Sequence, residues 1–245
     1  MAAEGKTIDA LSQFALSPIV AGFTNSNLYM LIAAGAISAL MILGMKPRAM
    51  VPGRLQSLAE VAYEFVAGMV KEQVGKEGMK YFPFVFTLFM FILFGNMLGM
   101  LPYAFTFTSH IAVTVTLALI VFILVTAVAI AIHGAKFFGY FFPEGAPVAL
   151  APIIIPVEII SYLSRVVSLS VRLFANMVAG HVMLKVFATF VVLLGGLGSL
   201  GLVGAAAPLA LNVALVGFEF LVAFLQAYVF AILTCIYLHD AVHLH

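Results

Sequence analysis

The chain has 245 residues, of which 64% are hydrophobic and only 9% are charged, whereas about 25% of residues are charged in soluble domains. With a mean hydropathy of +1.21, this composition indicates a membrane protein and excludes an ordinary soluble domain. The single cysteine excludes an internal disulfide, and a net charge of +1 with basic residues interspersed among acids excludes a nucleic-acid partner.

The N-terminal segment, residues 1–27, begins with polar residues and charges of both signs. It lacks the basic and apolar regions of a cleaved signal peptide, so we expect the mature chain to begin near Met1. The apolar run that follows approaches the roughly 20 residues that a spanning helix needs. It predicts a first transmembrane helix over 28–45.

The segment 52–74 differs from this span because its apolar side chains recur at helical spacing among charged ones. Leu58, Val61 and Phe65 lie on one side of the predicted helix, and Glu60 and Glu64 lie on the other. Such a pattern is typical of an amphipathic helix that lies on the membrane surface.

Two further apolar runs predict spanning helices over 81–102 and 111–134. A Gly-rich break at 195–204 divides the remaining apolar chain, and we expect one long helix on each side, over 147–194 and 205–240. At about 1.5 Å per residue both exceed a hydrocarbon core of about 30 Å, so they should form a strongly tilted hairpin. The predicted fold class is an all-α integral membrane protein with five transmembrane helices and one interfacial amphipathic helix.

Basic residues set the expected orientation, since short loops rich in Lys and Arg stay in the cytoplasm. Six of them fall between the first two spans, namely Lys46, Arg48, Arg54, Lys71, Lys76 and Lys80. Five crossings then leave the N-terminus outside and the C-terminus inside. The sequence has no visible internal repeat, which weighs against a secondary transporter built from paired halves.

Ionisable side chains within the two long helices are the candidate functional groups, because a charge inside a membrane helix is costly. Glu158, Arg165 and Arg172 are spaced by seven residues and lie nearly in line, and Ser168 and Asn176 belong to the same stripe. Arg172 is the strongest candidate, and the alternative is that it snorkels to a lipid headgroup. For Arg165 the alternative is a membrane anchor, and for Glu158 it is a pair with Arg165.

His181 lies nine residues beyond Arg172 and points away from its stripe. On the last helix Glu219 and Gln226 are seven residues apart and share a face. An antiparallel hairpin that sets this glutamine level with Arg172 brings the glutamate close to His181. Histidine and a desolvated glutamate both exchange protons near neutrality, whereas arginine stays charged. The sequence therefore predicts a proton relay beside a fixed positive charge.

Other interpretations of these residues stay open at this point. A self-contained secondary transporter would use Arg172 to bind an anionic substrate, and an intramembrane metalloenzyme or redox subunit would use His181 and Glu219 as ligands. His239 and His243 are four residues apart and could bind a metal, although a solvated tail explains them better.

Three segments carry the most specific pattern, namely FGNMLGMLPY (94–103), SLSVRLFANMVAGH (168–181) and EFLVAFLQAYVFAILTCIYLHD (219–240). The first resembles the Asn-containing segment of the third helix in subunit a of F-type ATP synthases. The other two resemble the penultimate and last helices of that family. The resemblance covers most of the chain from about residue 28 onward.

The resemblance implies a role for each candidate residue. The implied proton-translocating set is Arg172, Glu219, His181, Asn176, Gln226, Ser168 and Glu158. Arg172 would be the essential stator arginine, with the two amides as its polar neighbours. Glu219 and His181 would take up protons from the outer side, and Ser168 and Glu158 would lie on the exit side.

Two positions depart from the best-known bacterial members of this family. The Glu and the His of the uptake pair are exchanged between the two helices, as in mitochondrial-type members. Gly99 stands where some bacterial members have an acid, so we expect a less acidic access channel.

By the same resemblance the chain is a non-catalytic proton channel with two aqueous half-channels separated by Arg172. The expected partners are a rotating ring of c subunits that each carry a carboxylate, the b subunits of a peripheral stalk, the rest of the ATP synthase and membrane lipid. No cofactor or metal is expected. The expected location is the bacterial inner (plasma) membrane, with the mitochondrial inner membrane less favoured.

Overall fold

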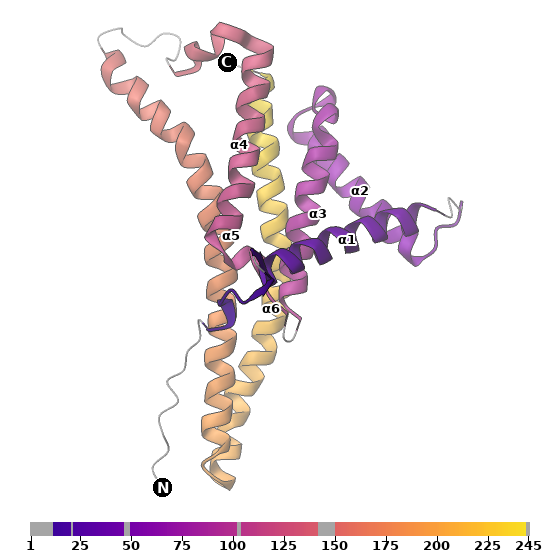
Figure 1. Cartoon of the computed structure of the whole chain (residues 1–245), viewed down its shortest axis with the longest axis vertical. Coiled ribbons are helices and arrows are strands. Elements are labelled where there is room, and N and C mark those ends of the chain that lie inside the picture. The colour runs from indigo at the N-terminus through magenta and orange to yellow at the C-terminus, as the bar shows by residue number, and fades with distance from the viewer. Residues whose placement is uncertain (1–11, 21, 47–49, 102–103, 142–149, 244–245) are drawn as a thin grey trace.

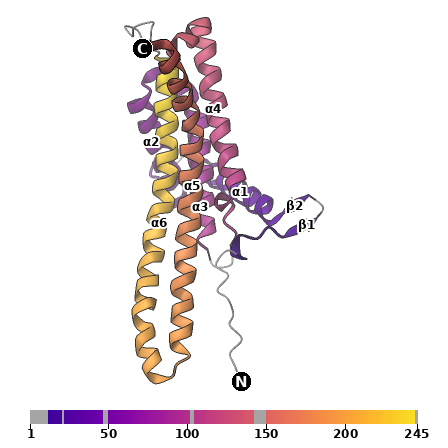
Figure 2. The ribbon, with the colours of Figure 1, turned by 90° about the vertical axis from the view of Figure 1, so that its left-hand side faces the viewer.

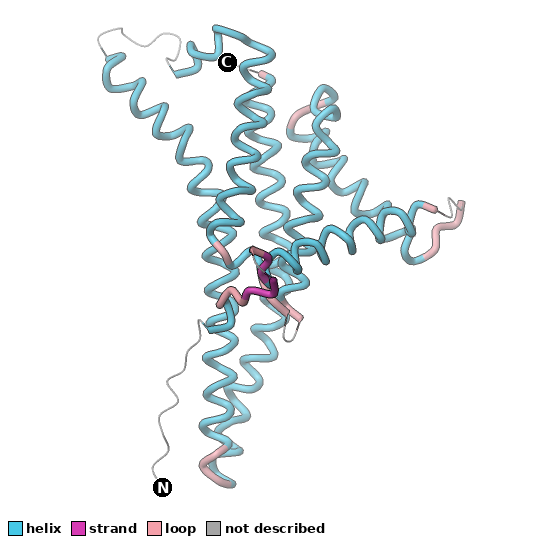
Figure 3. Tube along the Cα trace, viewed as in Figure 1, coloured by secondary structure: helices cyan, strands magenta, loops and turns pink. Residues whose placement is uncertain are grey.

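Six α-helices, four short 3₁₀ helices and one small β-hairpin make up the part of the chain that the structure describes (Figures 1 and 3). The computed structural model describes residues 12–20, 22–46, 50–101, 104–141 and 150–243. The α-helices are α1 (Asn25–Met45), α2 (Arg54–Gln73), α3 (Phe82–Gly99), α4 (Ile111–His133), α5 (Ala151–Gly195) and α6 (Ser199–Val242). The short elements are η1 (Ser12–Phe14), β1 (Pro18–Val20), β2 (Phe23–Thr24), η2 (Lys76–Tyr81), η3 (Phe107–Ser109) and η4 (Gly134–Phe141). The predicted all-α class is confirmed.

Five helical segments are long and apolar enough to cross a membrane, as the predicted fold class requires. They are Asn25–Met45, Lys76–Gly99, Ile111–His133, Ala151–Gly195 and Gly201–Val242. The helix expected to begin at 28 begins at Asn25, and the helix expected to begin at 205 begins at Ser199. The expected helical positions 102 and 147–149 lie outside the described residues.

The two last helices form a long antiparallel hairpin. From the turn to the middle of α5, α5 and α6 lie side by side (Figure 2), whereas the start of α5 diverges from α6 (Figure 1). They have 45 and 44 residues, so each is about 67 Å long. The turn between them is short because Gly198 adopts a φ of +87°, which side-chain-bearing residues rarely adopt. Gly201 also has to be glycine, since a Cβ there would overlap the carbonyl of Leu194.

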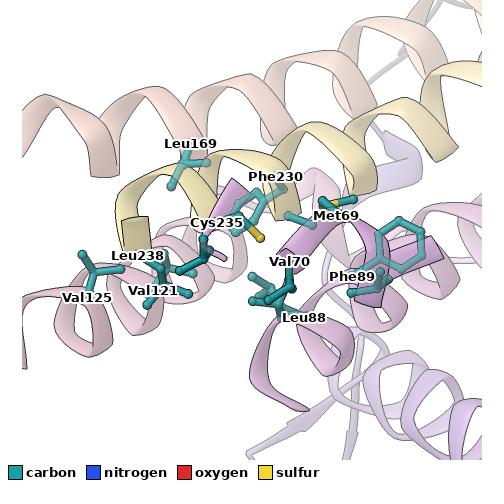
Figure 4. Close-up of a cluster of buried hydrophobic side chains, with 14 of the residues drawn as sticks. Met69, Val70, Leu88, Phe89, Val121, Val125, Leu169, Phe230, Cys235 and Leu238 are labelled. Carbon is teal, nitrogen blue, oxygen red and sulfur yellow. The ribbon is translucent and has the colours of Figure 1, made fainter. Parts of the chain in front are cut away.

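Helix α6 lies at the centre of the described bundle and contacts α2, α3, α4 and α5. Small residues follow its inward face at four-residue spacing, and Ala223, Ala227, Ala231 and Cys235 are fully buried. Such residues let neighbouring helices approach closely. Figure 4 shows the apolar cluster that results, with Met69, Val70, Leu88, Phe89, Val121, Val125, Leu169, Phe230, Cys235 and Leu238 among its members.

Helix α1 runs across the direction of the long hairpin, whereas α4 runs along it (Figure 1). Helix α2 returns from the end of α1 towards α3, and its apolar residues are divided between two surroundings. Leu58 and Val61 are exposed, as a lipid-facing surface requires, whereas Val66 and Met69 are buried in the cluster. The amphipathic helix therefore packs against the bundle with its C-terminal half.

Candidate functional site

His181 and Glu219 face each other across the hairpin in the middle of α5 and α6. His181 Nδ1 lies 3.0 Å from Glu219 Oε1, and only 13% and 6% of the two side chains are exposed. The helical register predicts this pairing, and the structure contains it. The two atoms lie close without a hydrogen bond, because Nδ1 is bonded to the Met177 carbonyl and Glu219 Oε1 is buried without a hydrogen-bond partner in the described chain. A small turn of either side chain aligns the imidazole and the carboxylate for passing a proton.

Gly180 makes room for this pair on α5. A Cβ at position 180 would overlap the carboxylate of Glu219, so no side chain fits there while the glutamate keeps its place. The residue before the histidine thus allows α6 to bring its acid close to α5.

Backbone carbonyls and one hydroxyl surround the two nitrogens of His181. Nδ1 lies 3.0 Å from the Met177 carbonyl oxygen, one turn back on α5. Nε2 lies 3.1 Å from the Gly99 carbonyl oxygen and 3.0 Å from Thr106 Oγ1. Gly99 is the last residue of α3, and the last carbonyls of a helix have no partner within it. A carbonyl only accepts, so Met177 favours a hydrogen on Nδ1 and Gly99 favours one on Nε2. Both nitrogens carry hydrogen only in the imidazolium, and Nδ1 is the nitrogen that lies beside Glu219.

Asn96 on α3 fixes α6 next to this site. Its amide nitrogen donates to the Ala223 carbonyl at 3.2 Å, and its amide oxygen accepts from Thr108 Oγ1 at 2.8 Å. All three residues are buried. Because Ala223 is one turn from Glu219, this bond sets the height at which the carboxylate meets α5.

A cavity of about 320 Å³ opens between α5 and α6 beside Glu219. Its polar lining consists of Glu219, Asn176 and Gln226, so the structure brings three of the predicted residues around one space. The other lining residues are Ala179, Gly180, Met183, Leu215, Phe218 and Val222. The volume holds several water molecules, since one needs about 30 Å³.

Arg172 lies outside this cavity, on the exposed side of α5. It is exposed, as are Ser168, Val171 and Ala175 around it. It forms no hydrogen bond or ion pair with any residue in the described ranges. Its positive charge therefore has no ion-pair partner among the described residues, although it lies near enough to the Tyr237 hydroxyl to interact with it electrostatically.

Arg165 has quite different surroundings, although it shares the predicted stripe. It is half-buried and pairs with Asp240 of α6 at 3.2 Å. Its guanidinium also lies over the rings of Tyr237 and Tyr162, at 4.7 Å and 5.2 Å from their centroids. Arg165 thus joins α5 to the C-terminal end of α6. Glu158 is half-buried two turns earlier on α5.

The N-terminal segment reaches the site, which the sequence did not indicate. The ring of Phe14 lies 6.1 Å from the imidazole of His181, and the amide nitrogen of Gln13 is buried without a hydrogen-bond partner in the described chain.

His110 stacks on Phe105 at 5.2 Å where α4 begins, and burial lowers its pKa below the usual value. This imidazole is therefore uncharged near neutral pH.

Sequence reasoning missed Thr106, the carbonyl of Gly99 and the fit of Gly180 against Glu219. A carbonyl leaves no signal in the residue type, and Thr106 is 75 residues from His181 in sequence. The resemblance does single out position 99, where a Cβ would overlap the Thr106 hydroxyl. The missing side chain at Gly99 is thus what lets this hydroxyl reach the imidazole.

The C-terminal histidines lie away from the pair. The rings of His239 and His243 are 4.9 Å apart, and His239 Nδ1 is 3.9 Å from Asp240 Oδ1. Within the described residues, no group of three or more His, Cys, Asp or Glu side chains is arranged to hold a metal ion.

Comparison with known proteins finds one family over almost the whole chain. Residues 27–239 match the family described as "ATP synthase A chain". The chain is 64% identical over 252 residues to an ATP synthase subunit a from Granulibacter bethesdensis, covering 100% of both chains. It is 56% identical to the subunit from Gluconacetobacter diazotrophicus, covering 98% of this chain and 99% of the relative. The subunit from Rhodospirillum rubrum is 55% identical, with 96% and 98% covered.

Proposed function

The chain belongs to the ATP synthase subunit a family, and from this membership we propose that protons cross it through two half-channels separated by Arg172. As a member of this family it is an integral membrane component of an F-type ATP synthase and provides its proton channel. The proposal concerns the residues that carry the protons, the immediate partners and the membrane.

The observation that carries the proposal is the exposure of Arg172 on a membrane helix. An exposed cation within the bilayer requires an anionic partner, because its desolvation is otherwise uncompensated. A carboxylate on each subunit of a rotating c-ring is such a partner, and it would meet Arg172 one subunit at a time. The guanidinium keeps the facing carboxylate ionised and repels a proton that would cross directly.

The buried pair supports a route for protons on the outer side of Arg172. A proton taken up at His181 passes from Nδ1 to Glu219 Oε1 over the 3.0 Å contact. From Glu219 it enters the cavity lined by Asn176 and Gln226 and reaches a carboxylate of the ring. After rotation it leaves to the cytoplasm past Ser168 and Glu158, which lie beyond Arg172 towards the start of α5.

The remaining parts of the proposal concern assembly. The chain performs no covalent chemistry itself, since proton transfer and charge repulsion account for every step. We place the c-ring against the exposed face around Arg172 and the b subunits of the peripheral stalk elsewhere on the chain. The proposed membrane is the bacterial inner membrane, as expected from the three bacterial relatives named above.

ATP-driven acidification of inverted membrane vesicles tests the proposal. Arg172→Ala should abolish acidification while the complex still assembles and hydrolyses ATP. Arg54→Ala is the matched control, because Arg54 is an exposed arginine at the start of α2, and it should pump like the wild type. Undiminished pumping by Arg172→Ala would refute the half-channel mechanism.

A further inference from the structure

The hydroxyl of Thr106 is the only side-chain group in the described chain that contacts His181 Nε2 through a hydrogen bond. Oγ1 lies 3.0 Å from Nε2 and 3.2 Å from the Gly99 carbonyl oxygen, which is itself 3.1 Å from Nε2. These three polar atoms form a small triangle between η3, the end of α3 and α5. Thr106 is 3% exposed, so bulk water does not replace its hydroxyl in this triangle.

The two neighbours of Nε2 differ in what they can do with a proton. The Gly99 carbonyl accepts hydrogen bonds but has no hydrogen to give, whereas a threonine hydroxyl donates one hydrogen and also accepts. The hydroxyl can therefore turn between two positions. In one it donates to Gly99 and accepts from Nε2, and in the other it donates to Nε2.

Thr106 also lies on the side of His181 from which protons are expected. It precedes η3 in the connection between α3 and α4. The loop at 102–110 has no lysine or arginine, which predicts that it faces outwards. Ser109 Oγ donates to the Thr106 carbonyl at 2.6 Å and holds this turn in place. On the opposite ring nitrogen His181 meets Glu219. The imidazole thus separates the hydroxyl from the carboxylate.

We propose that protons reach His181 through the Thr106 hydroxyl, an inference that rests on the proposed function of the His181–Glu219 pair. The step starts from the tautomer with its hydrogen on Nδ1. The Oγ1–H bond breaks as an Nε2–H bond forms, and a hydronium ion that reaches Oγ1 from the outer side supplies the replacement proton and leaves as water. The imidazolium then gives its Nδ1 proton to Glu219 Oε1. Each atom ends with its original number of bonds once Glu219 releases its proton, the hydroxyl rotates back and the imidazole ring turns over to carry its hydrogen from the side of Thr106 to the side of Glu219.

A purely structural role for Thr106 would give different results from a relay. If the side chain only filled space, valine would replace it, because valine has the same shape without the hydroxyl. If the hydroxyl carries protons, the serine variant should keep the rate of ATP synthesis and the valine variant should lose it. The comparison of the two variants therefore separates the chemistry from the packing.

The test measures ATP synthesis driven by a proton gradient in inverted vesicles as the luminal pH, which corresponds to the outer side, is varied. Thr106→Val should lower the rate by at least about tenfold and shift the profile to more acidic luminal pH, since loss of a positioned proton-transfer group costs a factor of this size or more. Thr106→Ser should stay within about twofold of the wild type. Thr234→Val is the matched control, because Thr234 is a fully buried threonine whose hydroxyl donates only to its own helix.

A second variant acts on the hydroxyl without removing it. A Cβ at position 99 would overlap Thr106 Oγ1, so Gly99→Ala should displace the hydroxyl and shift the pH profile in the same direction. Wild-type rates and pH profile in Thr106→Val, with the complex assembled, would overturn the inference, as would a loss in Thr106→Ser equal to that in valine.

His181→Ala in the same assay distinguishes the two proposals. If His181→Ala loses synthesis while Thr106→Val keeps it, the Thr106 inference fails and the proposed function stands. If His181→Ala also keeps it, the uptake pair itself is wrong and the inference falls with it. Loss in His181→Ala and Thr106→Val with rescue by serine supports both.

Discussion

Two side chains, His181 and Glu219, concentrate the exchangeable protons of the described hairpin at one contact. Their 3.0 Å separation and burial mean that each side chain has the other as its ionisable neighbour. Met177, Gly99 and Thr106 then decide which nitrogen faces the acid. The direction of proton transfer is thus a property of the shell around the imidazole rather than of the histidine alone.

Glu219→Gln keeps the shape of this side chain and removes its ability to take a proton. We expect proton pumping to fall by about a hundredfold or more, as for loss of a positioned acid or base, while assembly remains normal. ATP-driven vesicle acidification measures the effect. Glu64→Gln, an exposed carboxylate on α2, is the control, and equal pumping by both variants would show that Glu219 carries no protons.

Gly180→Ala tests the fit between α5 and this carboxylate. The added Cβ overlaps Glu219, so either the carboxylate leaves His181 or the helices separate, at a cost of about 1–3 kcal/mol. Vesicle acidification should decrease strongly. Gly217→Ala is the control because a Cβ there meets nothing within 4 Å, and a Gly180→Ala enzyme that pumped as well would contradict the geometry.

Helical periodicity predicts the contact between His181 and Glu219 because both residues lie in long regular helices. Their register follows once the turn is placed, and a histidine and a glutamate are conspicuous in apolar helices. The contact with Thr106 has no such regularity, since its backbone belongs to an irregular connection. A helical wheel cannot position a residue of that kind. Every residue has a backbone carbonyl, so the sequence does not single out that of Gly99.

At the scale of the elements, the two arginines of α5 perform different tasks. Arg165 holds Asp240 and two tyrosine rings of the bundle, whereas Arg172 faces outwards. Arg165→Gln should lower the thermal stability of the purified complex by about 1 kcal/mol, the modest value of a partly exposed pair, and leave the protons pumped per ATP unchanged. Arg172→Gln should leave the thermal stability unchanged and lower the number of protons pumped per ATP. Thermal unfolding followed by vesicle acidification checks both, and a coupling defect in Arg165→Gln would contradict the assignment.

The row of small residues on α6 predicts a sharp sensitivity to size. Ala227 is fully buried at the centre of the row, so Ala227→Leu should push α6 away from its neighbours and cost about 1–3 kcal/mol. The thermal unfolding temperature of the purified complex measures this loss. Ala206→Leu, on an exposed part of α6, should leave it unchanged. Equal temperatures for the two variants would mean that α6 is not tightly packed.

The start of α6 shows where composition misleads. The sequence treats glycines at 195–204 as one break, but Gly201 and Gly204 lie inside the helix and only Gly196–Gly198 turn the chain. Glycine weakens a helix in water, yet here close approach requires it, because Gly201 lies against the Leu194 carbonyl. The type of each element was predictable, whereas this boundary depended on a contact between the two helices at the hairpin turn.

At the scale of the whole molecule, helix lengths set how the chain can sit in a bilayer. Helix α1, with 21 residues, is about 31 Å long and matches the hydrocarbon core in an upright position. The hairpin helices, at about 67 Å, fit the same core only when inclined by roughly 60° or more from the membrane normal. The crossing of α1 over the hairpin provides this difference in direction (Figure 1).

The single cysteine makes the predicted orientation easy to test. Cys235 is fully buried, so a membrane-impermeant maleimide should leave the wild-type chain unlabelled. Leu197→Cys, in the exposed turn between α5 and α6, should be labelled in intact cells or spheroplasts, and His243→Cys only in inverted vesicles. The opposite pattern would reverse the orientation.

The inclination of the hairpin also determines where the membrane voltage does its work. Displacement along α5, from the level of His181 past Arg172 to Ser168, is largely parallel to the membrane plane. Moving one charge across the full voltage yields about 2.3 kcal/mol per 100 mV. At an inclination of about 60°, the roughly 20 Å from His181 to Ser168 still advances about 10 Å along the membrane normal. An aqueous half-channel stays near the potential of the solution it opens to, so in the proposed mechanism most of the voltage falls across the dry separation at Arg172. In the proposed mechanism, an inclined hairpin thus converts a gradient across the membrane into a difference of proton occupancy between two neighbouring points in the membrane plane.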